Sequence, residues 1–365
     1  MFELPRGLWD GCRDHPFCGA KAMVVGEKTI RRLLLVAAAA LLAAAAGSIS
    51  GNAGAAENFP APDEIIVTLL GTGSPVPSTT RFGPATLVQA GGLNLLFDAG
   101  RGVTVRLYQL GMSFGKGIDA VFLTHYHSDH VEGLPDLWMT GYMFGPFGSR
   151  AKPLRLWGPS DDTAGLNGVV KIAKGLTEAF SDDVRIRQAD EHVTAAATGI
   201  EPHNFAQDGV VFEEGGVKVT AFAVNHGDLI KPSVGYRVDY ASRSVTISGD
   251  TQPDENLIRH AAGTDLLIHE VFAISPQLAA VPALKPVADH HTSPEQAGTV
   301  FSQVKPKLAV YTHFVLIGTA GEEIVTRTRT TYQGPLASGE DLMRLTIGSS
   351  VSLKRWDPNL GAYPK

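Results

Sequence analysis

The chain has 365 residues, a formal net charge of −6 and 44% hydrophobic residues, a composition typical of a globular protein with two ordinary domains or one large layered domain. The excess of acidic residues gives no support to a general nucleic-acid-binding surface, although it leaves room for a local basic patch. The 40 glycines indicate many tight turns, as a strand-rich fold needs.

Residues 23–55 have the order of a secretory signal peptide. The basic pair Arg31-Arg32 precedes an apolar run over 33–46, and small residues at 53–55 match an A-x-A cleavage site. The apolar run is short for a membrane span, and an uncleaved N-terminal anchor is the alternative interpretation. We therefore expect a periplasmic or secreted protein with no membrane segment beyond the leader. The arginine pair also weakly resembles a twin-arginine export signal.

The leader defines the other boundaries of the chain. Residues 1–22 precede Met23 and have the character of an upstream extension from a misassigned start codon, 56–63 form a linker, and 64–365 form the folded domain. Cleavage after Ala55 would remove both cysteines, so no thiolate would be available as a metal ligand or nucleophile.

Strands and helices alternate from residue 64 onward. The run at 64–70 is apolar and rich in β-branched residues, and the glycines between 85–90 and 93–100 indicate a hairpin. Further strands are expected at 118–124, 154–158, 217–226, 233–240, 244–250, 265–270 and 308–313. Helices are expected at 102–112, 164–180, 253–262 and 294–303.

Several of these apolar strands end in a residue that binds metal ions or protons. The five strand-end residues are His125, His226, Asp250, Glu270 and His313. Strand ends at one edge of a sheet core converge in space, and the loops beyond them stay open to substrate. The pattern therefore predicts one functional site built from distant parts of the chain.

The stretch "HYHSDH" places four ligand-type residues within six positions. His125 and His127 lie two residues apart and point the same way on an extended chain, whereas Asp129 and His130 follow a turn and aim at a second point. A single histidine here could simply lie on a surface loop without binding metal. Four ligand-type residues within six positions argue against that interpretation. The spacing predicts two neighbouring metal ions.

Each ion then needs ligands from elsewhere in the chain. We expect His226 to join the first pair and His313 the second, with Asp250 bridging both ions through its two oxygens. Nitrogen and oxygen ligands without thiolate favour two Zn²⁺ ions, with Mn²⁺ or Fe²⁺ as alternatives. Two such ions about 3.5–4 Å apart would clamp a hydroxide.

These motifs resemble the metallo-β-lactamase-fold superfamily. The resemblance rests on H-x-H-x-D-H at 125–130, on "NHG", "SGDT" and "YTHF" in the same order, and on "LLGTGSPVP" and "FDAGRG" near the start. It covers about residues 64–350. It implies an α/β fold in four αββα layers, with two mixed sheets face to face, helices outside and metal ions at one edge.

Within the superfamily the chain is most similar to ribonuclease Z and the arylsulfatase-like proteins. The segments 248–272 and 290–298 carry that likeness. They imply that His291 donates a proton to the leaving oxygen and that Glu270 orients it, with His290 as the neighbouring alternative. The resemblance also suggests that Asp129 accepts a proton from the nucleophile. Supporting positions around the ligands are Asp98, Thr124, Ser128 and the turn at 71–73.

The substrate is less constrained than the metal site. Export would separate the protein from precursor tRNA, and 141–216, where the family carries its tRNA-gripping arm, holds few clustered basic residues. We therefore expect an exported hydrolase whose substrate is a small anionic phosphodiester or sulfate ester. We expect the hydrolase to be a homodimer. The alternatives are a tRNA 3′-end endonuclease, a lactonase or β-lactamase-type hydrolase, and a non-catalytic metal-binding module.

Overall fold

The computed structural model describes residues 60–161 and 167–364. The expected upstream extension and signal peptide, residues 1–55, lie outside this described part of the chain, as do residues 56–59 of the expected linker at 56–63. Within the described part, no helix is long and apolar enough to cross a membrane.

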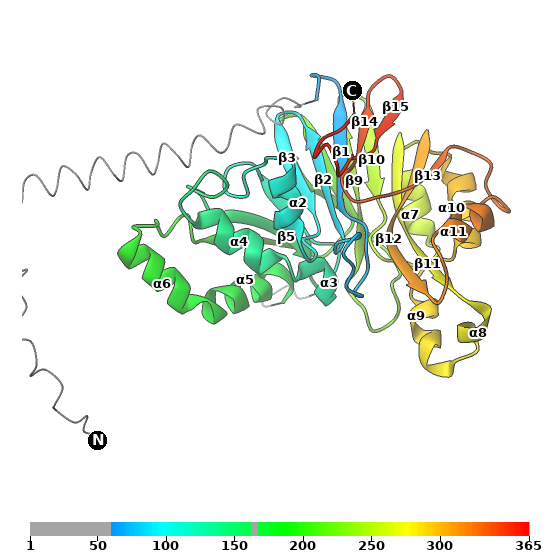
Figure 1. The fold of residues 1–365 in the computed structure, drawn as a ribbon, viewed down its shortest axis with the longest axis horizontal. Helices are drawn as coiled ribbons and strands as arrows, with labels where there is room; N and C mark the ends of the chain where they lie inside the picture. Colours follow the sequence, from blue (N-terminus) through cyan, green and yellow to red (C-terminus); the bar gives the residue numbers. More distant parts are fainter. Residues whose placement is uncertain (1–59, 162–166, 365) are drawn as a thin grey trace, which may run out of the picture. The chain divides into compact units, whose positions relative to one another are not determined.

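Two mixed β-sheets form the centre of the described domain (Figure 1). The first has the order β15-β14-β1-β2-β3-β4-β5-β6 and the second the order β13-β12-β11-β10-β9-β8-β7. The strands of the first sheet are β1 (Ile65–Gly71), β2 (Ala85–Ala90), β3 (Leu93–Phe97), β4 (Ala120–Phe122), β5 (Leu154–Pro159), β6 (Ile200–Phe205), β14 (Met343–Ile347) and β15 (Val351–Lys354). Those of the second are β7 (Gly209–Glu214), β8 (Val217–Ala223), β9 (Val234–Tyr240), β10 (Arg243–Ile247), β11 (Leu266–Ile274), β12 (Leu308–Ile317) and β13 (Leu336–Ser338).

Helices connect the strands of both sheets. Those in the first half of the chain are α2 (Val103–Gln109), α3 (Ser128–Val131), α4 (Leu134–Tyr142), α5 (Gly168–Ala179) and α6 (Ser181–Asp190). Those in the second half are α7 (Glu255–Ala261), α8 (Pro276–Ala279), the 3₁₀ helix η1 (Pro282–Leu284), α9 (Lys285–Asp289), α10 (Pro294–Val304) and α11 (Glu322–Thr328).

Three apolar cores hold these layers together. The central core lies between the sheets and contains Phe97, Phe122 and Tyr236. Trp138 of α4 belongs to a second core on the outer face of the first sheet, and Phe301 of α10 to a third on the outer face of the second. Burial of the apolar faces of helices such as α4 and α10, together with both faces of each sheet, gives four layers. The expected αββα sandwich is therefore confirmed.

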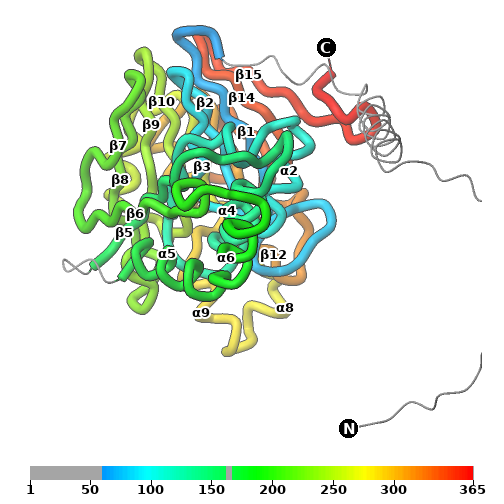
Figure 2. Tube along the Cα trace, turned by 90° about the vertical axis from the view of Figure 1, so that its left-hand side faces the viewer, coloured from blue at the N-terminus to red at the C-terminus, as the bar shows by residue number. Residues whose placement is uncertain are grey.

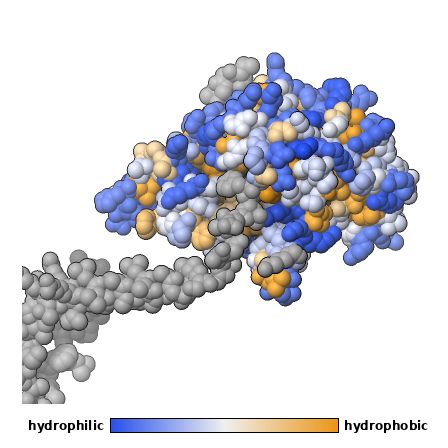
Figure 3. Space-filling view, turned by 90° about the horizontal axis from the view of Figure 1, so that it is seen from above, coloured by the Kyte–Doolittle hydropathy of each residue, from blue (hydrophilic) through white to orange (hydrophobic). Residues whose placement is uncertain are grey.

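The expected strands and helices are all present, but the sequence did not reveal five of the strands. β6, β7, β13 and β15 lie at the four sheet edges, and β14 lies next to β15. Edge strands bury less surface, so they lack the apolar runs used to predict strands, and an edge tolerates Pro202 within β6. At one side of the sandwich, β5 and β6 of the first sheet lie beside β7 and β8 of the second (Figure 2). One face of the surface mixes hydrophilic and apolar residues (Figure 3).

Candidate metal centre and active site

The predicted ligands converge at one edge of the sandwich. His125 follows β4, His127 precedes α3, and His226 and Asp250 follow β8 and β10. His125, His226 and Asp250 are buried and His127 is exposed. This arrangement places three deep ligand candidates beneath one that faces solvent.

Two of the strands do not end where the sequence suggested. β11 continues past Glu270 and β12 continues past His313. The β11–β12 pairing shifts register between His269 and Val271, and His313 adopts a positive φ of 44°. A bulge of this kind redirects a side chain without ending the strand. Both residues therefore reach the site from within strands.

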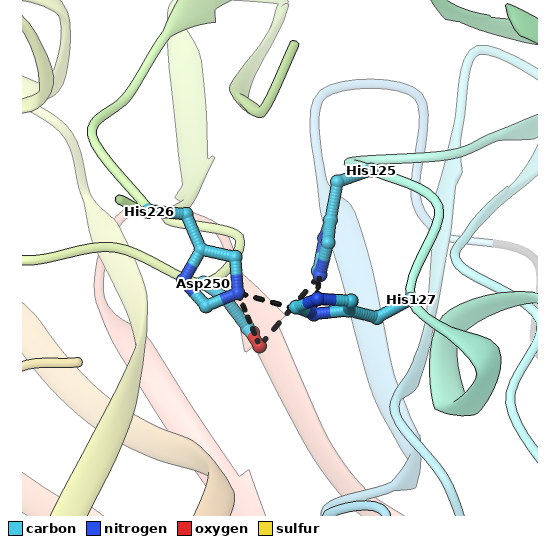
Figure 4. Close-up of side chains that lie close together, drawn as sticks. All are labelled: His125, His127, His226 and Asp250. Atoms are coloured by element: carbon cyan, nitrogen blue, oxygen red, sulfur yellow. Dashed lines mark hydrogen bonds and ion pairs between the residues drawn. The ribbon is translucent and has the colours of Figure 1, made fainter. Parts of the chain in front are cut away.

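The first ligand set is compact (Figure 4). The Nε2 atom of His125 lies 3.0 Å from Nδ1 of His127, and the Nε2 atom of His226 lies 3.2 Å from the same Nδ1. Asp250 completes the set, and the four ligand atoms lie within 4.8 Å of one another. The structure thus brings together the first predicted set.

The second set contains Asp129, His130 and His313, whose ligand atoms also lie within 4.8 Å of one another. The Nε2 atom of His313 is 3.1 Å from Oδ2 of Asp129. Oδ2 of Asp250 lies 3.4 Å from Nε2 of His130 and 3.3 Å from Nε2 of His313. The second set is therefore adjacent to the first.

Asp250 joins the two sets through one oxygen. Its Oδ2 atom also lies 3.9 Å from Nε2 of His125 and 3.7 Å from Nε2 of His226. The sequence led us to expect one oxygen for each set, but Oδ2 alone makes all of these approaches. A single oxygen atom therefore lies among four imidazole nitrogens that belong to both sets.

Buried partners fix the orientation of three of the imidazole rings. The Asp98 carboxylate accepts hydrogen bonds from the Thr124 hydroxyl at 2.9 Å and from Nδ1 of His130 at 2.9 Å. Because its proton is given to Asp98, the Thr124 oxygen accepts from Nδ1 of His125 at 3.0 Å. The His290 carbonyl accepts from Nδ1 of His226 at 2.9 Å. Each of these three rings is therefore oriented with Nε2 toward the site.

The donor set fits a divalent cation. Nε2 of His130 is buried and has no hydrogen-bond partner among the described residues. Burial lowers the pKa of His125 and lowers that of His226 to about 4, and partial desolvation of the His127 ring lowers the pKa of His127, which favours the neutral ligand form. Lone pairs and carboxylates this close together repel one another unless a cation lies among them. The His/Asp chemistry is that of a divalent metal site.

Nearby charges, rather than burial, decide the pKa values of His130 and of Asp250. Burial lowers the pKa of His130, but the nearby charges of Asp250 and Asp98 outweigh it and hold this pKa well above its usual value. Burial likewise opposes ionisation of Asp250, yet the surrounding histidines keep the pKa of its carboxyl well below the usual range. Asp250 is therefore ionised at neutral pH and carries the negative charge that a cation needs.

Glu270 and His291 form a pair beside this centre. Glu270 is fully buried, and its Oε1 accepts from Nδ1 of His291 at 3.2 Å and from the Thr292 backbone N–H at 2.9 Å. Burial lowers the pKa of His291, but the charge and hydrogen bond of Glu270 raise it to about 9. His291 also has a ring nitrogen within 4.8 Å of ligand atoms of Asp250 and His313. Glu270 thus keeps a protonated imidazole at the metal centre.

The structure distinguishes between neighbouring candidates. His291 contacts Glu270 through its side chain, whereas His290 contacts His226 through its backbone carbonyl. Asp98 and Thr124 lie directly behind the ligands, as expected. Ser128 is exposed at the start of α3, and within the described residues its hydroxyl makes no hydrogen bond.

Comparison with known proteins identifies the family. Residues 93–314 match the model of the beta-lactamase superfamily domain. A ribonuclease Z from Mycobacterium sp. (strain KMS) is 34% identical over 293 residues, covering 80% of this chain and 99% of that protein. The chain belongs to the metallo-β-lactamase-fold hydrolases, near ribonuclease Z.

Solved structures agree with this fold. The metallo-β-lactamase-fold protein YhfI from Bacillus subtilis gives a TM-score of 0.57 at 20% identity, covering 78% of this chain and 100% of that chain. The short form of human tRNase Z gives 0.54 at 23% identity, covering 78% and 98%. At these identities the likeness concerns the arrangement of the sheets and helices.

One buried residue that supports the metallo-β-lactamase-fold centre gave no signal in the sequence. Asp341 accepts hydrogen bonds from the backbone and hydroxyl of Thr72, from the Phe82 N–H and from the Arg106 guanidinium. The Thr72 carbonyl in turn accepts from the N–H of Phe314, the residue after His313. Asp341 therefore fixes the turn after β1 against the strand that carries His313. It lies in a short polar loop, and no local pattern distinguishes it from surface aspartates.

Helix α6 offers little that would bind an RNA backbone. Its Arg187 is paired with Asp183 and Glu191, and its Arg185 is paired with Asp182. Because the basic side chains of this helix are already neutralised, α6 is not a basic patch. This agrees with the low density of clustered basic residues expected for 141–216.

Proposed function

We propose that this chain hydrolyses phosphodiester bonds in RNA, as a ribonuclease Z-type endonuclease that cuts precursor tRNA at its 3′ end. The observation that carries the proposal is the Glu270–His291 pair placed beside two joined ligand sets. The 34% identity with ribonuclease Z, which spans 99% of that relative, supports the choice of reaction. This was the alternative that the sequence left open beside small-ester hydrolysis.

We propose two Zn²⁺ ions as the resident cofactors, with Mn²⁺ or Fe²⁺ as the alternatives. His125, His127 and His226 would hold one ion, Asp129, His130 and His313 the other, and Asp250 both. Such ions supply Lewis acidity for a phosphate oxygen and allow water to act as a nucleophile near neutral pH.

The protein's own groups would manage the protons. Nδ1 of His291 is committed to Glu270, so the transferable proton lies on Nε2, the atom free to face the leaving oxygen. The buried carboxylate of Glu270 stabilises the protonated ring before the transfer and keeps its orientation afterwards. Asp129 would be the proton acceptor on the nucleophile's side. Burial opposes ionisation of its carboxyl, but the hydrogen bond from His313 and the charges of His130 and His313 outweigh burial and lower its pKa, so the carboxylate is ionised.

A second candidate is hydrolysis of a small phosphodiester. The observation that favours it is the ion-paired surface of α6, which lacks free basic side chains for a long RNA. Both candidates use the same reacting groups and differ only in the size of the substrate. Hydrolysis of sulfate esters stays a prediction from the sequence, without support from the relatives described above.

A substrate panel tests these assignments. Zinc- or manganese-loaded protein is assayed with precursor tRNA carrying a 3′ trailer, with bis(p-nitrophenyl) phosphate and with an aryl sulfate. We expect cleavage of the tRNA at one position, whereas turnover of the aryl phosphate alone would favour the second candidate. No turnover of either phosphodiester would refute the proposal.

The residue-level control uses the two adjacent histidines. His291→Ala should lower kcat by about 10²–10⁴-fold, the usual contribution of a general acid. His290→Ala keeps the carbonyl that bonds His226 and should stay within a few-fold of the wild type. Equal losses in both variants would contradict the role given to His291.

Export to the periplasm and assembly as a homodimer also remain proposals. The order of basic, apolar and small residues over 23–55 supports export. An exported protein would not meet precursor tRNA, because precursor tRNA is cytosolic. Export would therefore favour the small-phosphodiester candidate.

A further inference from the structure

A pocket of about 250 Å³ lies at one side of the predicted metal centre. One wall comes from the ends of β5 and β6, including Pro159 and Phe205, and the other from the end of β8 and the start of β9, including Ala223 and Pro232. The pocket therefore opens between the two sheets, where β6 and β8 lie side by side (Figure 2).

Its walls are joined directly to the segments that carry the ligands. The hydroxyl of Tyr126, between His125 and His127, donates to the carbonyl of Pro159 at 2.5 Å. The backbone N–H of Val234 donates to the Thr124 carbonyl at 3.0 Å. Val224 lies two residues before His226 and also lines the pocket. The pocket and the ligand sets are thus neighbours at the edge of the sandwich that carries the ligands.

The strand order gives the separation of the two sites. In the first sheet, β6 is two strands away from β4, whose end carries His125. Because paired strands lie about 4.8 Å apart, the β6 wall of the pocket is roughly 10 Å from the ligands. This is the scale that separates a phosphate from the base of the same nucleotide.

The size and lining of the pocket favour one aromatic ring. Drug-sized ligands occupy pockets of about 300–1,000 Å³, so about 250 Å³ suits a single ring system rather than a whole dinucleotide. The half-buried Phe205 lines it, and nucleic acid bases stack on such side chains. Ser233 adds a buried hydroxyl with no hydrogen-bond partner among the described residues.

We propose that this pocket is a subsite for the nucleobase adjacent to the scissile phosphate. The inference rests on the proposed phosphodiesterase function and extends it by naming the part of the substrate that is recognised. The ring enters between Phe205 and the end of β8 while the phosphate stays at the ligand sets. Substrates without an aromatic ring near the reacting phosphate should bind weakly.

The test compares two probes that differ only in the base. Binding of 5′-AMP and of ribose 5-phosphate to the zinc-loaded protein is measured by isothermal titration calorimetry, without turnover. We expect the wild type to bind 5′-AMP at least about tenfold more tightly. Ala223→Phe fills the pocket from the exposed end of β8 and should reduce this ratio to about one.

Matched variants separate loss of the pocket from loss of the fold. Lys218→Phe adds the same ring to β8 outside the pocket and should keep the wild-type ratio. Ala206→Phe fills the pocket from the opposite wall, and serves if circular dichroism shows that Ala223→Phe is unfolded. A wild-type ratio near one, or an unchanged ratio in a folded filled variant, would overturn the proposal. Base discrimination without hydrolysis of any phosphodiester would instead remove the proposed function and retain the subsite.

Discussion

Nδ1 of His291 lies 3.2 Å from Oε1 of the buried Glu270, and this contact holds a proton at the edge of the metal centre. The pKa of His291 is raised to about 9 because the charge of Glu270 outweighs the effect of burial. The proposed general acid is therefore charged at neutral pH and loses its proton as the pH rises.

The pair predicts a specific change in the pH dependence of catalysis. Glu270→Gln removes the negative charge that raises the pKa of His291, so the alkaline limb of the kcat profile should move to lower pH. Steady-state rates from pH 6 to 10 check this. A Gln variant with a lower kcat but an unmoved alkaline limb would show that His291 is not the group titrating there.

Asp98 should govern metal affinity without being a ligand. It accepts from both Thr124 and His130, so Asp98→Asn would disturb the orientation of His125 and His130 together. Losses of such supporting partners typically lower metal affinity by about 10–100-fold. Competition with a chelating dye measures the affinity, and Asp239→Asn, on the distant half-buried end of β9, is the control. Unchanged affinity in Asp98→Asn would mean that the ligands hold their orientation unaided.

The shared oxygen of Asp250 predicts an unequal loss of metal. Asp250→Ala removes the atom that approaches both sets and should empty both, whereas His226→Ala removes a donor from one set only. Elemental analysis after dialysis should find close to no metal in the first variant and at least one equivalent in the second. Equal metal contents would indicate that Asp250 serves only one set.

Asp341 should matter for stability as well as for the site. Its carboxylate is buried and paired with Arg106 and with donors from Thr72 and Phe82. Asp341→Asn leaves the Arg106 charge without its partner, which costs about 3 kcal/mol in comparable buried pairs. Urea unfolding measures the change. The surface pair variant Asp182→Asn should change the free energy of unfolding by less than about 0.5 kcal/mol.

Export and oligomeric state need separate measurements. Residues 1–60 fused to a reporter that is active only outside the cytoplasm should give signal, and Arg31→Lys with Arg32→Lys should abolish it if the twin-arginine route is used. Absence of signal would restore tRNA as an accessible substrate.

Sedimentation equilibrium tests the predicted homodimer, and a single species at monomer mass would show it to be wrong.

The sequence by itself determined the family, the four layers and the ligand candidates. Spacing such as H-x-H-x-D-H is local, so the residues at 125–130 reveal two pairs of ligand candidates without any tertiary information. The apolar strands that precede His226 and Asp250 are equally visible. Edge strands such as β6 were not predicted from the sequence, because their burial depends on neighbours in space.

Only the tertiary structure decided how these residues work together. It placed Oδ2 of Asp250 among four imidazoles, selected His291 over His290 by its contact with Glu270, and revealed Asp341 beneath the turn at Thr72. Each of these relationships joins residues that are far apart in the chain. Hydrogen bonds and charge interactions depend on distances of a few ångströms, and those distances are set by packing of the two sheets, which no local sequence pattern contains.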